Sequence, residues 1–305
     1  MRYQDIVPIS EPITADRQGA RRHYGVHPYF TRRPYNVVRA YIQHFTKEGD
    51  TVLDPFGGSG VTAIEAVLEG RCGIQSDVNP LANFIASGVM RLSKGKVEVL
   101  AAGLERLKSE CLTELSTIES GGAVSIASDF DRLAKRRLPE NADVEAVRDL
   151  FNHRQFSVVA VLKKHILETS DPHARNALLL AWSAALPKLT RTFLSAEGRA
   201  ESRGGSSIFS IYRYKVAKNP IDLPGWKTFE ERARNVIEAK REIDQIVAYR
   251  RGLGKSLGKF RALNCDVLDL PKRLKEHVDF IFTDPPYGGH IAYLDLSVMW
   301  TALLG

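Results

Sequence analysis

The tetrapeptide Asp284-Pro285-Pro286-Tyr287 combines groups that could hold a flat heterocycle bearing an amine. The Asp284 carboxylate and the Pro285 carbonyl can each accept a hydrogen bond from one N–H of an aromatic amine, and the two prolines restrict the backbone. Tyr287 offers an aromatic face for stacking. The preceding apolar run VDFIFT indicates a buried strand, so the tetrapeptide lies at a strand end. A simple Pro-Pro turn, with Asp284 as a turn former, is the alternative.

A second segment, residues 49–70, predicts a strand, a tight turn and a helix in succession. Thr51-Val52-Leu53 fits a short buried strand, residues 57–60 read GGSG, and residues 61–69 fit a helix that ends at Gly70. Glycines lack side chains, so backbone N–H groups at the helix N-terminus can approach a ligand closely. The segment therefore predicts a nucleotide-type binding loop.

An acidic residue follows the next expected strand, CGIQSD, which ends at Asp77. A carboxylate at this place can accept hydrogen bonds from a ribose diol. The pattern Gly58-x-Gly60-x-x-Ala63 followed by Asp77 also fits a loose dinucleotide fingerprint, so an NAD enzyme is a rival interpretation. Asp54-Pro55 counts against it, because a carboxylate before the glycines repels a pyrophosphate and suits a ligand with an ammonium group. The NAD interpretation also gives the Pro-Pro-Tyr segment no role.

Taken together, the two segments resemble those of the amino-methyltransferases that act on exocyclic amines of nucleic-acid bases, above all the DNA adenine and cytosine amino-methylases. In that family DPFxGSG, here residues 54–60, is the methyl-donor loop, and DPPY, residues 284–287, is the catalytic loop. The segment HPYFTRRPYNVVRAYI, residues 27–42, fits as well, since many members carry a His/Pro-containing segment and a helix before the donor loop. The two core motifs are specific as a pair.

The resemblance implies an α/β fold with a Rossmann-like class I methyltransferase sheet and S-adenosyl-L-methionine as cofactor. The expected strands lie in TVLDPF, CGIQSD, KFRALNCDVLDL and HVDFIFTD, and Asn79-Pro80 begins a helix. For Asp266, a contact with the donor adenine and an ordinary strand-end turn remain equally open. The expected cofactor-binding residues are Asp54, Pro55, Phe56, Gly58, Gly60, Asp77, Asn79 and Asp266.

The catalytic residues implied are Asp284, Pro285, Pro286 and Tyr287. An aromatic amine is a poor nucleophile because its lone pair is delocalised into the ring. Hydrogen bonds from both N–H groups, to the Asp284 carboxylate and the Pro285 carbonyl, favour a pyramidal nitrogen, while Tyr287 stacks on the base and orients it. A base inside a duplex is out of reach, so the target must be flipped out or unpaired. No cysteine nucleophile is needed.

Composition is compatible with a polyanionic partner. The 305 residues include 43 Lys and Arg against 36 Asp and Glu, a net charge of +7. Cys72, Cys111 and Cys265 are widely spaced and form no metal-type pair. The N-terminus is polar, and the longest apolar run, ALLLAWSAAL, is too short to span a bilayer. We therefore expect a cytoplasmic protein without a metal or a membrane association.

Between the expected second and third strands lies a long insertion. We assign residues 1–94 and 259–305 to the methyltransferase core and residues 95–258 to a mainly helical insertion, a candidate target-recognition region. From Lys188 to Lys227 this insertion carries eight basic against three acidic residues. SIFSIYRYKV alternates like a strand, with Arg213 and Lys215 on one face and Tyr212 and Tyr214 on the other. The alternative is an edge strand with solvated charges. Candidate nucleic-acid-binding residues are Arg199, Arg203, Arg213 and Lys215.

The expected sheet is incomplete at the C-terminus, because Gly305 lies a single expected helix beyond the catalytic loop. The fourth strand would then be an exposed apolar edge, which natural proteins avoid. We expect a second chain, a second copy or a further C-terminal segment to complete the sheet and to be needed for activity.

Three functions are compatible with these patterns. The first is methyl transfer to an exocyclic amine in DNA, with adenine favoured over cytosine, in a system of a restriction-modification kind. An RNA guanine-amine methyltransferase is the second, although such enzymes usually have a short stretch between the two motifs. A non-catalytic, methyltransferase-like DNA-binding subunit is the third, and the intact Asp284 and Tyr287 argue against it.

Overall fold

The computed structural model describes residues 7–17, 21–193 and 206–305, and the chain divides into two compact units. The first, here called the sheet unit, comprises Met1–Gly25, Thr31–Ser93 and Ala239–Tyr287. The second, the helical unit, comprises Val26–Phe30, Lys94–Glu238 and Gly288–Gly305.

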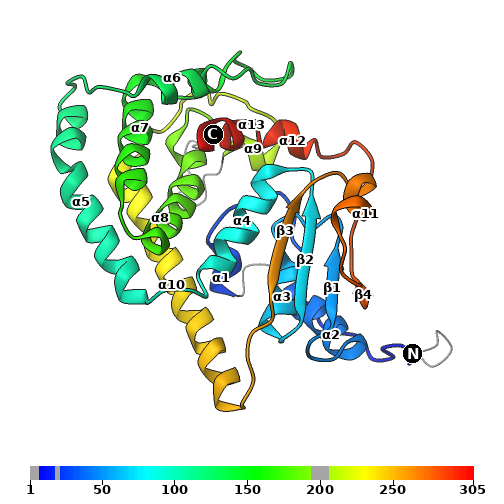
Figure 1. The fold of residues 1–305 in the computed structure, drawn as a ribbon. Coiled ribbons are helices and arrows are strands. Elements are labelled where there is room, and N and C mark those ends of the chain that lie inside the picture. The colour runs from blue at the N-terminus through cyan, green and yellow to red at the C-terminus, as the bar shows by residue number, and fades with distance from the viewer. Residues whose placement is uncertain (1–6, 18–20, 194–205) are drawn as a thin grey trace. The chain divides into compact units, whose positions relative to one another are not determined.

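The sheet unit is built on four parallel strands (Figure 1). Their order is β3-β2-β1-β4. Their bounds are β1 Thr51–Asp54, β2 Cys72–Asp77, β3 Phe260–Asn264 and β4 Phe280–Ile281. Each strand lies within one of the four segments expected from the sequence. An all-parallel sheet with helical connections confirms the α/β, Rossmann-like fold class.

Helices cover one face of this sheet. Helices α3 Val61–Leu68 and α4 Pro80–Arg91 pack directly on the strands, and α2 Tyr35–Phe45 packs on α3. The short helix α1 Arg22–Gly25 precedes α2 in the chain. Every residue of α3 is buried, which explains why the sequence between the glycine turn and Gly70 is almost continuously apolar. A Cβ atom at Gly73 of β2 would lie 2.1 Å from the Ala63 carbonyl oxygen, so this glycine permits close packing of α3 on the sheet.

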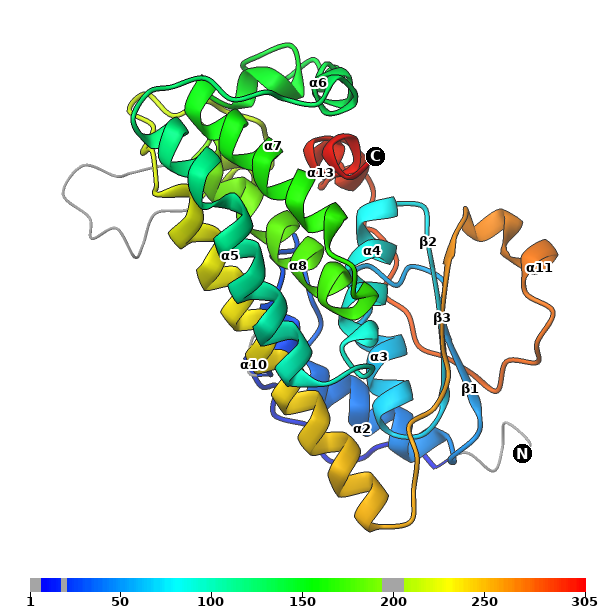
Figure 2. The same cartoon turned by 60° about the vertical axis from the view of Figure 1, so that its left-hand side comes forward.

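A smaller apolar cluster covers the other face of the sheet. Figure 2 shows the connection from β3 to β4 on this side, opposite α3 and α4. Leu53 and Ile74 from the sheet pack there with Cys265 and Leu270. The connection from β3 to β4 supplies this cover through η5 Val267–Asp269 and α11 Leu270–Arg273. The edge strand β4 is short, and its Ile281 side chain is 55% exposed. The sheet therefore carries an apolar side chain open to solvent at the β4 edge.

The helical unit contains α5, α7 and α8 packed side by side (Figure 2). Long apolar stripes on these helices form its core, with Trp182 fully buried and its indole N–H donating to the Val159 carbonyl oxygen at 3.0 Å. The insertion is mainly helical over its described residues. Its elements are α5 Val97–Glu119, α6 Ser128–Ala134, η2 Val147–Leu150, α7 His153–Glu168, α8 Pro172–Ala185, η3 Leu186–Leu189, α9 Ser207–Ser210 and α10 Gly225–Gly252. Helices α12 Tyr293–Leu296 and α13 Val298–Leu304 follow the catalytic loop.

The strand expected in SIFSIYRYKV is wrong. Residues Ser207–Ser210 form the short helix α9, whose first turn is capped by the Ser206 hydroxyl. The two tyrosines do not share a face: Tyr214 is 1% exposed, whereas Tyr212 is 39% exposed and has a positive φ of 51°. Burial of Tyr214, whose hydroxyl donates to the Leu296 carbonyl oxygen, outweighs the local alternation.

Among the described helices, none combines the length and the apolar character needed to cross a membrane.

Candidate active site

The donor loop and the catalytic loop follow neighbouring strands. β1 and β4 pair in parallel, with Leu53 opposite Ile281, and the Phe282 N–H donates to the Leu53 carbonyl oxygen at 3.1 Å. Parallel strands end at the same edge of a sheet, so the residues after them meet there. The Thr283 hydroxyl donates to Asp54 Oδ1 at 2.9 Å. The structure thus brings together two motifs that lie 229 positions apart in the sequence.

Asp54 is the centre of this link. Its side chain is 6% exposed and accepts two more hydrogen bonds, from the Thr62 hydroxyl to Oδ2 at 2.8 Å and from the Phe56 N–H to Oδ1 at 3.1 Å. Burial raises the pKa of Asp54, against the opposing effect of these hydrogen bonds. The carboxylate therefore joins β1, the first turn of α3 and the catalytic loop. Pro55 and Phe56 are half-buried beside it.

The glycine turn requires its glycines. Gly60, the N-cap of α3, has φ 93°, and a Cβ atom there would lie 2.5 Å from the Ala86 Cβ. Gly58 also has a positive φ, 51°. A Cβ atom at Gly57 would lie 2.6 Å from the Gln75 Cβ. The turn is consequently compact and presents backbone rather than side chains at the start of α3.

Asp77 holds the turn from the end of β2. Its Oδ2 accepts from the Gly58 N–H at 2.8 Å, and its Oδ1 accepts from the Asn79 N–H at 2.8 Å. Burial raises the pKa of Asp77, while these two hydrogen bonds act in the opposite direction. Asn79 caps α4 by accepting from the Leu81 N–H at 3.0 Å, as the Asn-Pro sequence predicts.

Asp266 lies in a strand-end turn after β3. Its exposed carboxylate accepts from the Leu268 N–H at 2.8 Å and so caps η5. This is the simpler of the two interpretations left open by the sequence, and a contact with the donor adenine stays a prediction.

The catalytic-loop side chains form a hydrogen-bonded group with a residue that the sequence analysis missed. The Tyr287 hydroxyl donates to Asp284 Oδ1 at 2.5 Å. Arg33 Nη2 forms an ion pair with the same Oδ1 and donates to the Tyr287 hydroxyl at 3.1 Å. Pro285 and Pro286 are exposed. The signal for Arg33 was present in HPYFTRRP, the segment that resembles the family, but two adjacent arginines before a helix do not indicate a partner.

These contacts favour the ionised form of Asp284. Partial burial acts to raise its pKa, but the hydrogen bonds from Tyr287 and Arg33 and the Arg33 charge outweigh it, so the pKa of Asp284 lies below its ordinary value. Tyr287 remains 69% exposed, which leaves its ring accessible. The neighbouring Arg32 donates from Nε to the Ser59 hydroxyl at 3.0 Å, so consecutive arginines reach the catalytic loop and the donor loop.

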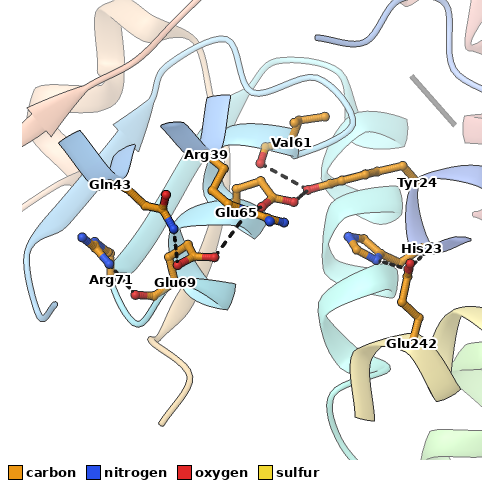
Figure 3. Close-up of polar contacts among 9 residues, drawn as sticks. All are labelled: His23, Tyr24, Arg39, Gln43, Val61, Glu65, Glu69, Arg71 and Glu242. Atoms are coloured by element: carbon orange, nitrogen blue, oxygen red, sulfur yellow. Dashed lines mark hydrogen bonds and ion pairs between the residues drawn. The ribbon is translucent and has the colours of Figure 1, made fainter. Parts of the chain in front are cut away.

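A buried polar network holds α3 behind the glycine turn (Figure 3). Glu65, which is fully buried, accepts from the Tyr24 hydroxyl at 2.8 Å and from Arg39 Nε at 2.9 Å. Burial raises the pKa of Glu65 to about 7. Beside it, His23 Nδ1 lies 2.6 Å from Glu242 Oε2. The sequence analysis did not identify this network, because the partners come from segments distant in the chain.

Of the four candidate nucleic-acid-binding residues, the structure describes Arg213 and Lys215. Arg199 and Arg203 lie outside the described residues. Arg213 forms an ion pair with Asp143, and Lys215 is exposed. Among the residues that the structure describes, no group of three or more His, Cys, Asp or Glu side chains could hold a metal ion.

Comparisons with known proteins agree with the family resemblance. Residues 10–86 match the family model described as DNA methylase, N6_N4_Mtase. The chain is 22% identical over 339 aligned positions to the type II methyltransferase M.MjaII of Methanocaldococcus jannaschii. That alignment covers 92% of this chain but only 62% of the relative's length. No solved structure matches the chain. The family match includes the donor loop, and the relative aligns with nearly the whole chain. Together they confirm that this protein resembles the DNA amino-methyltransferase family.

Proposed function

We propose that the protein transfers a methyl group from S-adenosyl-L-methionine to the exocyclic amine of a base in DNA, with adenine favoured over cytosine. The observation that carries this proposal is the Thr283–Asp54 hydrogen bond, which joins the catalytic loop to the donor loop. Methyl transfer needs a donor and an acceptor held side by side, and these two loops meet at one sheet edge.

The donor loop fits this cofactor. Backbone conformation and close packing at Gly60 exclude a larger residue, and Asp77 holds the turn by accepting a hydrogen bond from the Gly58 N–H. A compact turn at a helix N-terminus, with two carboxylates close to it, suits a ligand with both an ammonium and a carboxylate group. The cofactor, when bound, supplies an electrophilic methyl group on a sulfonium. The residues proposed to hold it are Asp54, Pro55, Phe56, Gly58, Gly60, Asp77, Asn79 and Asp266.

The catalytic loop fits an amine acceptor. Asp284 Oδ1 is occupied by Tyr287 and Arg33, whereas Oδ2 has no hydrogen-bond partner within the described part of the chain. We propose that Oδ2 and the Pro285 carbonyl accept from the two N–H groups of the target amine, with Pro286 restricting the loop. The exposed Tyr287 ring would stack on a base that is flipped out or unpaired.

Partners follow from the same proposal. The net charge of +7 suits DNA, with Arg199, Arg203, Arg213 and Lys215 as candidate contacts. The exposed Ile281 at the β4 edge favours a further strand supplied by a second chain, a second copy or another segment. A restriction-modification role is consistent with the type II methyltransferase relative. A cytoplasmic location is part of the same proposal.

The test is to identify the methylated product. The protein would be incubated with radiolabelled S-adenosyl-L-methionine and either duplex DNA or bulk transfer RNA, alone and with any polypeptide encoded next to it. Digestion to nucleosides then identifies the modified base. Label in adenine of DNA supports the proposal, and label in cytosine corrects the base. Label in RNA guanine refutes it, as does specific DNA binding without any transfer, which would indicate a non-catalytic subunit.

A further inference from the structure

Arg33 contacts both side chains of the proposed catalytic loop. It precedes Pro34, which caps α2 with φ −59° and so restricts the backbone beside the arginine. The three side chains form a closed group, in which Arg33 reaches Asp284 Oδ1 and the Tyr287 hydroxyl, and Tyr287 reaches the same Oδ1. Arg33 is half-exposed and Asp284 is one-third exposed, so solvent competes with these contacts.

The direction of the hydrogen bonds gives this group one arrangement. Arg33 can only donate, and the ionised Asp284 can only accept. The Tyr287 hydroxyl accepts a hydrogen bond from Arg33 and donates one to Asp284. Each bond in such a chain polarises the next, which strengthens the group as a whole. Arg33 therefore orders the carboxylate and the ring at once.

Resting on the proposed function, we propose that Arg33 is a positioning residue for methyl transfer. By filling Asp284 Oδ1 it leaves Oδ2 as the oxygen that accepts from the target amine, and its charge favours the ionised carboxylate, which can only accept. Through the Tyr287 hydroxyl it also fixes the ring on which the base stacks. Arg33 is not expected to touch the reacting atoms, and it cannot act as a base because its guanidinium stays protonated.

A competing role for Arg33 is a direct contact with a DNA phosphate. If Arg33 contacts a phosphate, its replacement weakens DNA binding, reduces the salt dependence of binding and leaves the ionisation of Asp284 unchanged. If Arg33 is a positioning residue, its replacement changes the ionisation of Asp284 and leaves DNA binding nearly unchanged. Arg33 and Tyr287 are the groups that lower the pKa of Asp284 in the described structure, so the titration of this carboxyl separates the two roles.

The first test needs no activity. The side-chain carboxyl carbons of the full chain would be followed by carbon NMR as the pH is lowered, and the Asp284 signal would be assigned by its loss in Asp284→Asn. We expect the pKa of Asp284 to rise in Arg33→Ala and to return toward the wild-type value in Arg33→Lys, which keeps the charge. The control Arg132→Ala removes an exposed arginine paired with Asp129 and should change nothing. An unchanged Asp284 titration in Arg33→Ala overturns the proposal.

The second test is kinetic. Breaking hydrogen bonds to a charged group costs about 1.5–3 kcal/mol, so we expect kcat of Arg33→Ala to fall about 10- to 100-fold. The acidic limb of its pH profile should move to higher pH, and donor affinity should stay the same. A change confined to the KM for DNA overturns the proposal in favour of a phosphate contact. If the wild-type chain transfers no methyl group, alone or with any polypeptide encoded next to it, the proposed function fails, and the NMR titration still decides whether Arg33 sets the ionisation of Asp284.

Discussion

Replacing Thr283 with Val tests whether the donor and catalytic loops form one site. The change keeps the shape of the side chain and removes the hydroxyl that donates to Asp54 Oδ1 at 2.9 Å. Asp54 would keep its hydrogen bonds from Thr62 and Phe56, so the donor loop should stay folded. The link to the catalytic loop would be lost.

The structure sets the size of the effect. A hydrogen bond to a charged group contributes about 1.5–3 kcal/mol, and the exposure of Thr283 favours the lower value because water can replace the hydroxyl. A loss of about 1.5 kcal/mol in the transition state corresponds to roughly a tenfold lower rate. We therefore expect Thr283→Val to lower kcat about tenfold at saturating donor and DNA.

The matched control is Thr62→Val. Thr62 donates to the other oxygen of the same carboxylate at 2.8 Å, but it lies within the donor loop helix and does not reach the catalytic loop. Because Thr62 is 4% exposed, its loss should lower the free energy of unfolding by about 2 kcal/mol. We expect its effect on kcat to be much smaller than that of Thr283→Val.

The assay combines urea denaturation with methyl transfer at saturating substrates. Equal kcat values for the two variants would refute the reasoning, because the carboxylate would then matter only for folding. A wild-type kcat in Thr283→Val would also refute it, because the loops would then be positioned by other contacts.

Two further predictions concern the frame of the site. Burial raises the pKa of Glu65 from about 4.5 to about 7, so its protonation favours the folded state. This contribution is fully present below about pH 4.5 and is lost as the pH rises through about 7. It amounts to roughly 3 kcal/mol. Urea denaturation should show that the free energy of unfolding of the wild type decreases with pH over this range, and that this dependence is lost in Glu65→Gln. An equal pH dependence in the two proteins would contradict the role given to Glu65. At the turn, Gly60→Ala must place a Cβ atom 2.5 Å from the Ala86 Cβ at φ 93°, whereas Gly49→Ala has φ 90° and open space. We expect the free energy of unfolding to fall by about 1 kcal/mol in Gly49→Ala and by at least twice that in Gly60→Ala. Equal thermal shifts would show that packing at the turn is unimportant.

Local patterns in the sequence predicted the sheet and both loops. Strand, glycine turn and helix from Thr51 to Leu68 need only short-range information, since the apolar run and the glycine positions determine them together. The Asn-Pro start of α4 is also local, because Asn79 caps the helix with its own side chain. The meeting of the two motifs was predictable in outline, because parallel strands end at a common edge.

Interactions between distant segments were not predictable. Arg33 and Tyr287 are 254 positions apart, and nothing in the local sequence pairs Arg33 with the catalytic loop. The buried Glu65 reads as an ordinary helical glutamate until Tyr24 and Arg39 are placed against it. The expected strand around Tyr212 was wrong because alternation describes exposure only when no tertiary contact, such as the burial of Tyr214, overrides it.

Comparing donor binding with methyl transfer in Asp284→Ala tests the central claim most directly. Asp284 forms no hydrogen bond or ion pair with the donor loop among the described residues, since its polar partners are Arg33 and Tyr287. Calorimetry should therefore give a Kd for S-adenosyl-L-methionine within about twofold of the wild-type value. Transfer to DNA should fall by at least about a hundredfold, the scale expected when a group that positions the reacting amine is removed. Unchanged transfer in this variant would contradict the account.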